Sequence, residues 1–159
     1  MDQDAKKKVL RRVVYGLYAL GVRVDDQMHA MTVNWVMQAS FEPPMIAVAI
    51  ENESRSLPML RRSGAFVLNI LPTGARQLAG ALGRSSANVP NKLEGVPHHP
   101  GPVSGAPVLD EATGWLECRI ASEQPAGDHV VMAAEVVEAG VQHEADTLTL
   151  KETGFRYAG

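Results

Sequence analysis

The chain has 159 residues, one cysteine, Cys118, and no apolar run long enough to cross a membrane. A single thiol cannot form an internal disulfide, and a membrane-spanning helix needs roughly 18 or more consecutive apolar residues. The charged N-terminal residues contain no apolar segment of the kind found in signal peptides. We therefore expect a protein that is not embedded in a membrane and that resides in the reducing cytoplasm.

A strong charge of either sign is also missing. The formal net charge is -3, which gives no overall attraction to nucleic acid. The basic residues between Lys6 and Arg12 are expected to form the solvated face of a short helix. Hydrophobic residues make up 45% of the chain and charged residues 21%, as in an ordinary globular protein. The length predicts a single domain over residues 1–159.

Several sequence motifs of well-known catalytic sites are absent. No GxGxxG or GxxxxGK[ST] occurs, which argues against the common nucleotide-binding folds. No HExxH, CxxC or GxSxG occurs either, so we expect no metal site and no serine nucleophile. Cys118 lies in a strand-like run between Leu116 and Ile120, which predicts a small buried residue and not a nucleophile.

The segment with the clearest pattern covers residues 29–50 and reads HAMTVNWVMQASFEPPMIAVAI. Residues 29–40 alternate, so a strand would place one row toward a core and a polar row on its other face. The core row consists of Met31, Val33, Trp35, Met37 and Ala39, and the polar face includes Thr32, Asn34, Gln38 and Ser40. After a turn, residues 45–50 predict a strand covered on both sides.

The polar row has two interpretations. An exposed strand explains it most simply, because antiparallel sheets often have one solvated face. Asn34, Gln38 and Ser40, however, supply hydrogen-bonding groups where exposed strands more often carry Thr, Lys or Glu. The row therefore also fits the wall of a ligand site.

The loop after this segment contains Ser54, Arg55 and Ser56 and leads into a helix predicted over residues 57–62. Free backbone N–H groups at a helix start, together with Arg55, form a plausible phosphate site. Ordinary N-capping by Ser56 explains the same residues equally well.

The remaining pattern predicts a mainly β, antiparallel fold, namely a β-barrel with short helices. Strands are expected at 17–24, 65–71, 113–123, 129–139 and 148–151, and further helices near the N-terminus and at 75–82. The runs 113–123 and 129–139 should form a hairpin. Residues 85–107 are rich in proline and predict one long surface loop, which contains Lys92.

A histidine with an unusual position completes the candidates. Gly127 and Asp128 form a turn that places His129 at the start of a strand, at the rim of the sheet. An isolated histidine is more often structural, so the pattern alone leaves its role open.

The order of several segments resembles the flavin reductase family, whose members have an FMN-binding split-barrel fold. These segments are TVNWVMQASFEPPMIAVAI, the Ser/Arg loop, SGAFVLNIL, NKLEG, WLECRI, GDHVVMAAEVVEA and GFRYAG. Two positions depart from the family pattern. Leu82-Gly83 stands where members often have an aromatic residue, and Trp35 where many have a small one.

The resemblance implies a homodimer with a flavin groove near the subunit boundary. It places Thr32, Asn34, Trp35, Val36 and Ser40 along the flavin, and Asn52, Ser54, Arg55 and Ser56 near its phosphate. It also implies that Lys92 reaches in from the long loop, that Tyr157 closes an edge, and that His129 lies near the flavin and nicotinamide rings as the catalytic residue.

The function implied is an NAD(P)H:flavin oxidoreductase that passes hydride from NADH or NADPH to FMN or FAD. The reduced flavin would serve an acceptor such as a monooxygenase. One alternative is a flavoredoxin-like electron carrier that keeps FMN and serves a redox-protein partner. Another is a binding protein without catalysis. The sequence alone chooses neither the nicotinamide nor the flavin.

Overall fold

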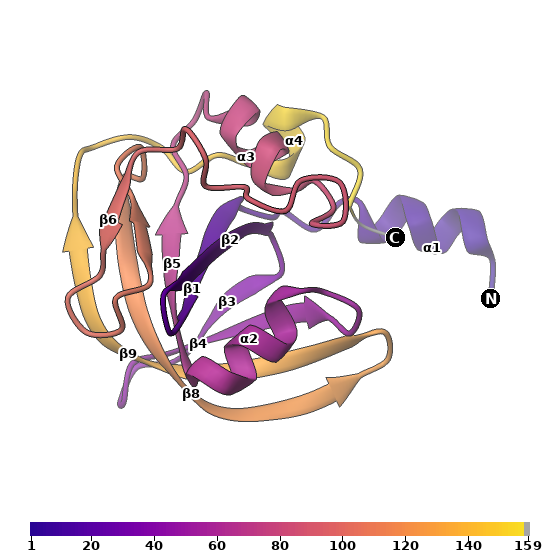
Figure 1. Ribbon diagram of the computed structural model, residues 1–159. Helices are drawn as coiled ribbons and strands as arrows, with labels where there is room; N and C mark the ends of the chain where they lie inside the picture. Colours follow the sequence, from indigo (N-terminus) through magenta and orange to yellow (C-terminus); the bar gives the residue numbers. More distant parts are fainter. Residues whose placement is uncertain (158–159) are drawn as a thin grey trace.

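Seven antiparallel strands form one strongly curved sheet in the computed structural model, which describes residues 1–157 (Figure 1). The strand order is β2-β1-β5-β8-β9-β4-β3, so β2 and β3 are the two edges. A separate two-stranded sheet pairs β6 with β7. The strands are β1 (Tyr18–Val24), β2 (Gln27–Val33), β3 (Val36–Ser40), β4 (Met45–Glu51), β5 (Ala65–Ile70), β6 (His98–Pro100), β7 (Pro107–Leu109), β8 (Gly114–Ala126) and β9 (His129–Val141).

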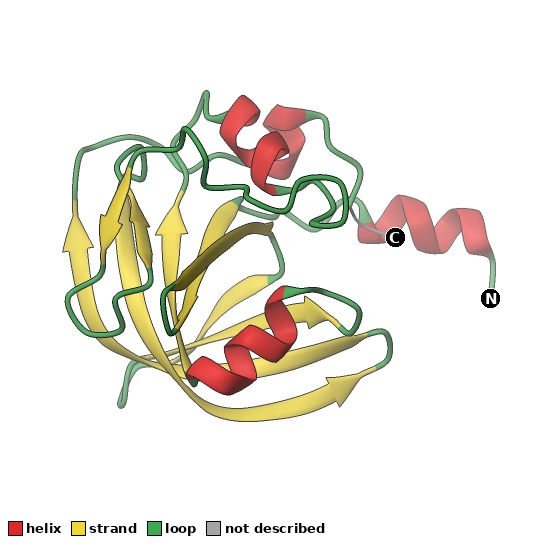
Figure 2. Cartoon of the chain, in the orientation of Figure 1, coloured by secondary structure: helices red, strands yellow, loops and turns green. Residues whose placement is uncertain are grey.

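Four short helices accompany the sheet (Figure 2). They are α1 (Gln3–Leu10), α2 (Ser56–Ser63), α3 (Arg76–Leu82) and α4 (Leu150–Thr153). This arrangement confirms the predicted mainly β, antiparallel split-barrel class. No helix within residues 1–157 is long and apolar enough to cross a membrane.

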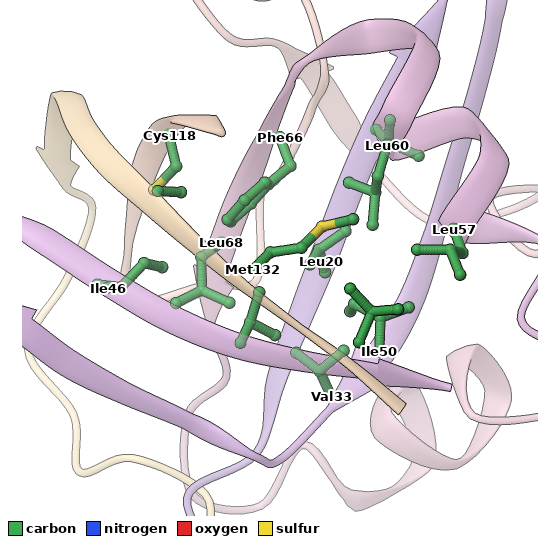
Figure 3. Packing of buried hydrophobic residues seen from close by; sticks show 14 residues of the cluster. Leu20, Val33, Ile46, Ile50, Leu57, Leu60, Phe66, Leu68, Cys118 and Met132 are labelled. Carbon is green, nitrogen blue, oxygen red and sulfur yellow. The ribbon is translucent and has the colours of Figure 1, made fainter. Parts of the chain in front are cut away.

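The main core fills the inside of the curved sheet and is closed by α2. Strands β1, β2, β4, β5, β8 and β9 all contribute buried apolar side chains to it, and Leu57 and Leu60 come from α2 (Figure 3). Cys118 is 1% exposed in this cluster, and burial raises the pKa of its thiol to about 12. The prediction that Cys118 is a buried structural residue is confirmed.

A second core lies on the other face of β1 and β2, under α3. Leu17, Ala19 and Ala30 pack there with Ala79 and Leu82, whereas Leu20 and Val22 face the main core. Successive residues of a strand point to opposite faces, so β1 and β2 serve both layers. This double burial fixes β2 between α2 and α3.

The hairpin predicted from residues 113–139 is confirmed and is longer than expected. Strands β8 and β9 pair antiparallel from Gly114 opposite Val141 to Ala126 opposite His129. Gly127 has φ 68° at the turn, a left-handed conformation that residues with a side chain rarely adopt. The turn therefore delivers His129 to the first position of β9.

The single strand predicted over residues 29–40 is wrong, because it breaks at Asn34 and Trp35 between β2 and β3. The apolar row consequently divides: Val33 joins the core, but Met37 is 63% exposed on the edge strand β3. Because β3 is an edge strand beyond the break, no other part of the described chain covers the face that carries Met37. Alternation within the segment carries no information about that bend.

Three other boundaries differ from the predictions. Ser56 does not cap α2: Arg55 occupies the N-cap position without a side-chain cap, and Ser56 is the first helical residue. The strand predicted at 148–151 is wrong, since only isolated bridges at Thr147 and Thr149 precede α4. The predicted loop 85–107 contains β6 and ends where β7 begins.

Helix α1 forms as predicted, and the Asp2 side chain caps it by accepting from the amides of Asp4 and Ala5. It extends away from the sheet (Figure 1) and buries none of its own residues. Of the GFRYAG segment at the other end of the chain, residues 158 and 159 lie outside the described residues.

Candidate functional site

A cavity of about 890 Å³ lies where the curved sheet remains open, between edge strand β2 and the end of β4. A strand at a sheet edge directs unpaired N–H and C=O groups outward, so β2 offers main-chain partners to a ligand. The lining residues come from β2, β4, the loop before α2, helix α3 with the segment after it, Lys92 and the C-terminal tail. A cavity of this size suits a ligand larger than a single amino acid or sugar.

Strand β2 runs along the cavity and contacts a different segment at each step. Ser54 lies against Met31, with 3.4 Å between its Oγ and the methionine Sδ. Thr32 donates from Oγ1 to the carbonyl of Ala79 at 2.6 Å. Asn34 donates from Nδ2 to the carbonyl of Tyr157 at 3.2 Å. The side chains of Thr32 on β2 and of Asn34, just after its end, thus tie α3 and the tail to the cavity wall.

One end of the cavity is cationic. Lys92 is 9% exposed and donates from Nζ to the carbonyl of Leu82 at 2.9 Å, and Arg55 donates to the carbonyl of Pro90 at 3.0 Å. Burial and the nearby charge of Arg55 lower the pKa of Lys92. Both cations have carbonyl partners, and neither forms an ion pair with a carboxylate among residues 1–157. Their charge remains available to an anion.

His29 lies behind this end, on β2. It is 4% exposed, and its Nε2 has no hydrogen-bond partner among the described residues. Burial, together with the nearby charges of Lys92 and Arg55, lowers the pKa of His29 to about 4. The hydroxyl of Ser56 is also buried without a partner. Neither side chain lines the cavity, so the groups at this end that fit a phosphate are the two cations.

Glu51 and Tyr157 line another part of the cavity and belong to a hydrogen-bonded cluster around His129. Nδ1 of His129 lies 2.6 Å from Oδ1 of Asp128, and Nε2 lies 3.3 Å from the hydroxyl of Tyr157. That hydroxyl donates to Glu51, and burial together with Glu51 raises the pKa of Tyr157. The hydrogen bond and charge of His129 lower the pKa of Asp128. We call this group the His129 cluster.

Two residues brace the cluster from outside the cavity. The ring of Trp35 lies 4.6 Å from that of His129 and 5.5 Å from that of Tyr157, measured between centroids. Asn52 donates from Nδ2 to the carbonyl of Gly127 at 3.1 Å, and its backbone N–H donates to the carbonyl of Asp128 at 3.0 Å. Trp35 thus supports the imidazole, and Asn52 holds the turn that presents it.

The distance between the two ends of the cavity follows from the number of residues along the chain. His29 marks the cationic end, and Asn34, the first residue after β2, marks the His129 cluster five positions further along the chain. At the rise of an extended strand this is about 16 Å. A planar ring system carrying a phosphate on a short chain spans a distance of this order.

The structure brings six of the predicted cofactor residues together on the cavity wall: Thr32, Asn34, Ser54, Arg55, Lys92 and Tyr157. Trp35 and His129 stand directly behind Tyr157, Asn52 holds the turn, and Ser56 lies at the start of α2. Val36 and Ser40 lie on β3 outside the lining. All of these residues remain predictions as flavin contacts.

Sequence reasoning missed several lining residues. Glu51 closes the hydrogen bond with Tyr157, and Arg84, Ser85 and Arg156 add polar groups from the segment after α3 and from the tail. The available signal was the basic and hydroxyl residues next to Gly83 and within GFRY. Their proximity depends on long-range packing, which local patterns do not encode.

Comparisons with known proteins agree with this geometry. The family described as "Flavin reductase like domain" matches residues 10–159. The chain belongs to this family. The flavin reductase relatives include the reductase component of 4-hydroxyphenylacetate 3-monooxygenase from Thermus thermophilus, which is 29% identical over 97% of this chain and 95% of the relative. A flavin reductase from Pseudomonas putida is 29% identical over 91% of this chain and 86% of its own length. These relatives confirm the prediction of an enzyme of the flavin reductase class.

Solved structures show the same flavin reductase fold. An NADH:FAD oxidoreductase from Streptomyces globisporus, in complex with NAD and FAD fragments, has a TM-score of 0.86 at 22% identity and covers 98% of this chain and 92% of that one. An FMN-binding protein from Thermus thermophilus has a TM-score of 0.77 at 24% identity, covering 84% of this chain and 74% of that one. At this level of identity the likeness establishes the fold alone.

Proposed function

We propose that this protein is an NAD(P)H:flavin oxidoreductase that reduces FMN or FAD and supplies the reduced flavin to an acceptor such as a monooxygenase. The observation that carries the proposal is the polarity of the cavity, with cations that have no carboxylate partner at one end and the His129 cluster about 16 Å away. A bound flavin supplies the redox chemistry by accepting hydride from a reduced nicotinamide.

The residues of the chain would hold the flavin at three places. Arg55, Lys92 and Ser54 bind its phosphate, since charged donors on flexible and loop-borne side chains suit phosphate oxygens. The free edge of β2 with Thr32, and Asn34 just after the strand, border its ring. Main-chain groups at a strand edge are rigid and well suited to orienting a planar ligand.

His129 acts in this proposal by position and not as a base. Asp128 and Trp35 fix its ring, and its Nε2 already faces a hydroxyl oxygen, that of Tyr157. A ligand oxygen that replaced this hydroxyl would meet a fixed imidazole beside the rings. Hydride transfer needs aligned rings and excluded water, and a fixed polar partner provides both orientation and local electrostatic support.

We further propose a homodimer, on the evidence of apolar side chains outside the cavity. Met37 lies on the edge strand β3 and Phe41 follows it directly, and they are 63% and 87% exposed. Val36 and Ser40 lie on this same strand, outside the lining of their own chain's cavity. Association through β3 would allow them to reach the flavin of the second subunit, as the family resemblance predicts. Sedimentation of the wild type and of Phe41→Ser tests this: the wild type should be a dimer and the variant should dissociate more readily.

The deciding experiment is a visible spectrum of purified protein with FMN, followed by NADH without oxygen. Bleaching of the flavin band at a catalytic rate, with continued NADH oxidation when free flavin is in excess, supports the reductase. A tightly bound flavin that NADH does not reduce supports the electron carrier instead. His129→Ala should lower NADH oxidation more than it lowers flavin affinity, and unchanged turnover would refute the role of His129.

A further inference from the structure

The C-terminal tail is pinned to the cavity on both sides of Arg156. Arg76 donates from Nε to the carbonyl of Thr153 at 2.8 Å, and its guanidinium lies 5.1 Å from the ring centre of Phe155. On the other side, Asn34 binds the carbonyl of Tyr157. Arg156 therefore lines the cavity from a segment that is held before and after it.

The Arg156 side chain has no partner in the described part of the chain, and the same holds for Arg84 on the same cavity. Arg61 pairs with Glu123, and Arg62 pairs with Asp25. Neither a carboxylate nor a carbonyl within residues 1–157 pairs with the Arg156 guanidinium. An exposed cation that lines a cavity without an internal partner is available to a ligand.

The carboxylates around the His129 cluster repel an anionic ligand, so such a ligand needs a cation nearby. Glu51 and Asp128 both lie in this cluster, where they bond to Tyr157 and His129. The cavity-lining cations Arg55 and Lys92 lie at the opposite end, near Pro90 and Leu82. A diphosphate brought near the cluster would meet two carboxylates, and Arg156 is the lining cation on the neighbouring residue of the tail.

We propose that Arg156 binds the diphosphate of the nicotinamide dinucleotide and so sets the affinity of the enzyme for its hydride donor. The inference rests on the proposed function and adds a residue that the family motifs do not assign. Guanidinium groups bind phosphate oxygens with paired N–H donors, which suits a diphosphate better than a single point charge does. Arg156 touches neither reacting ring in this arrangement, so its effect falls on binding of the donor.

The experiment compares two hydride donors at saturating FMN: NADH, which carries a diphosphate, and 1-benzyl-1,4-dihydronicotinamide, which carries none. Arg156→Gln should raise the KM for NADH by about three- to tenfold, the range of an exposed charged contact, with little change in kcat. The KM for the benzyl compound should stay within twofold of wild type in this variant. Arg156→Lys should recover part of the NADH affinity, because it keeps the charge and loses the paired donors.

Arg84→Gln is the matched control, since Arg84 also lines the cavity but follows α3. An unchanged NADH KM in Arg156→Gln, or a larger rise in Arg84→Gln, overturns the inference and leaves the proposed function standing. An equal loss with both donors also overturns it, because it shows a structural effect. Absence of turnover with either donor in the wild type refutes the proposed function and this inference together.

Discussion

The imidazole of His129 lies against the indole of Trp35, with 4.6 Å between the ring centroids and 39° between the ring planes. Trp35 sits in the break between β2 and β3, where its carbonyl accepts from the amide of Ala49 at 3.0 Å. The break in the long strand therefore turns an aromatic side chain toward the start of β9. A residue that departs from the family pattern supports the proposed catalytic residue.

Trp35→Ala should lower NADH oxidation by about tenfold, because His129 loses the surface that restrains its ring. Flavin affinity should change by less than about threefold, since Trp35 does not line the cavity. Trp35→Phe is the control that keeps an aromatic surface, and it should retain most of the activity. Equal losses in turnover and flavin affinity would contradict a role through His129.

Lys92→Met should weaken FMN binding by about tenfold or more, because it removes a charged phosphate donor while keeping an apolar stem in a buried position. Riboflavin, which has no phosphate, should bind both proteins alike. Fluorescence titration measures the two affinities directly. Arg62→Gln, an exposed residue paired with Asp25, controls for the loss of one positive charge. A parallel loss of riboflavin affinity would mean that Lys92 shapes the cavity and does not bind phosphate.

The fold could be predicted from the sequence wherever the apolar and polar residues of one segment were enough to identify a strand. Strand-like apolar runs predicted β1, β5, β8 and β9, and the segment containing Gly127 predicted the hairpin turn. The same patterns failed where packing against distant segments determines the local structure. Nothing local distinguishes a continuous strand from one that bends at Asn34, or the short helix α4 from a strand.

The candidate site was predictable in its main residues but not in its arrangement. Polar residues on β2 and the Ser/Arg loop suggested a ligand, and the family resemblance added Lys92 and Tyr157. Asn52 was expected near the phosphate, yet its side chain holds the carbonyl of Gly127 at the other end. Only the path of the chain shows that Asn52 reaches the turn before His129, because the two segments are far apart in the sequence.

His29 should make stability depend on pH in the acidic range. Its pKa is lowered from 6.5 to about 4 in the fold, whereas the unfolded chain retains the ordinary value. Between these values the unfolded state binds a proton that the native state does not, so the free energy of unfolding decreases as the pH falls through this window. The contribution of His29 to the free energy of unfolding is fully present above pH 6.5 and reaches at most about 3 kcal/mol.

Urea unfolding at about pH 7 and about pH 5 measures this dependence. His29→Gln should show a smaller loss of stability between the two conditions, because its side chain does not titrate. His99→Gln is the control, since His99 is exposed and pairs with Asp110 at the surface. The same loss in wild type and His29→Gln would contradict the assignment to His29.

Glu117 fastens the loop between β6 and β7 to the outer face of β8. Its carboxylate is fully buried and accepts from the amides of Val103 at 2.8 Å and Ser104 at 2.9 Å, and from the Ser104 hydroxyl at 2.6 Å. A Cβ at Gly101 would lie 2.5 Å from the carboxylate, so glycine permits this close approach. The buried charge is tolerated because three donors converge on it.

Glu117→Ala should lower the free energy of unfolding by about 3 kcal/mol, because it leaves buried donors without an acceptor. Glu117→Gln should also destabilise, since its amide presents N–H groups to donors. Exposed Glu138, opposite Glu117 on β9, provides the control: Glu138→Gln should change stability by less than about 0.5 kcal/mol. Gly101→Ala should destabilise the wild type more than it destabilises Glu117→Ala, because the smaller side chain makes room for the added methyl group. Additive effects of the two substitutions would show that the loop is held by other contacts.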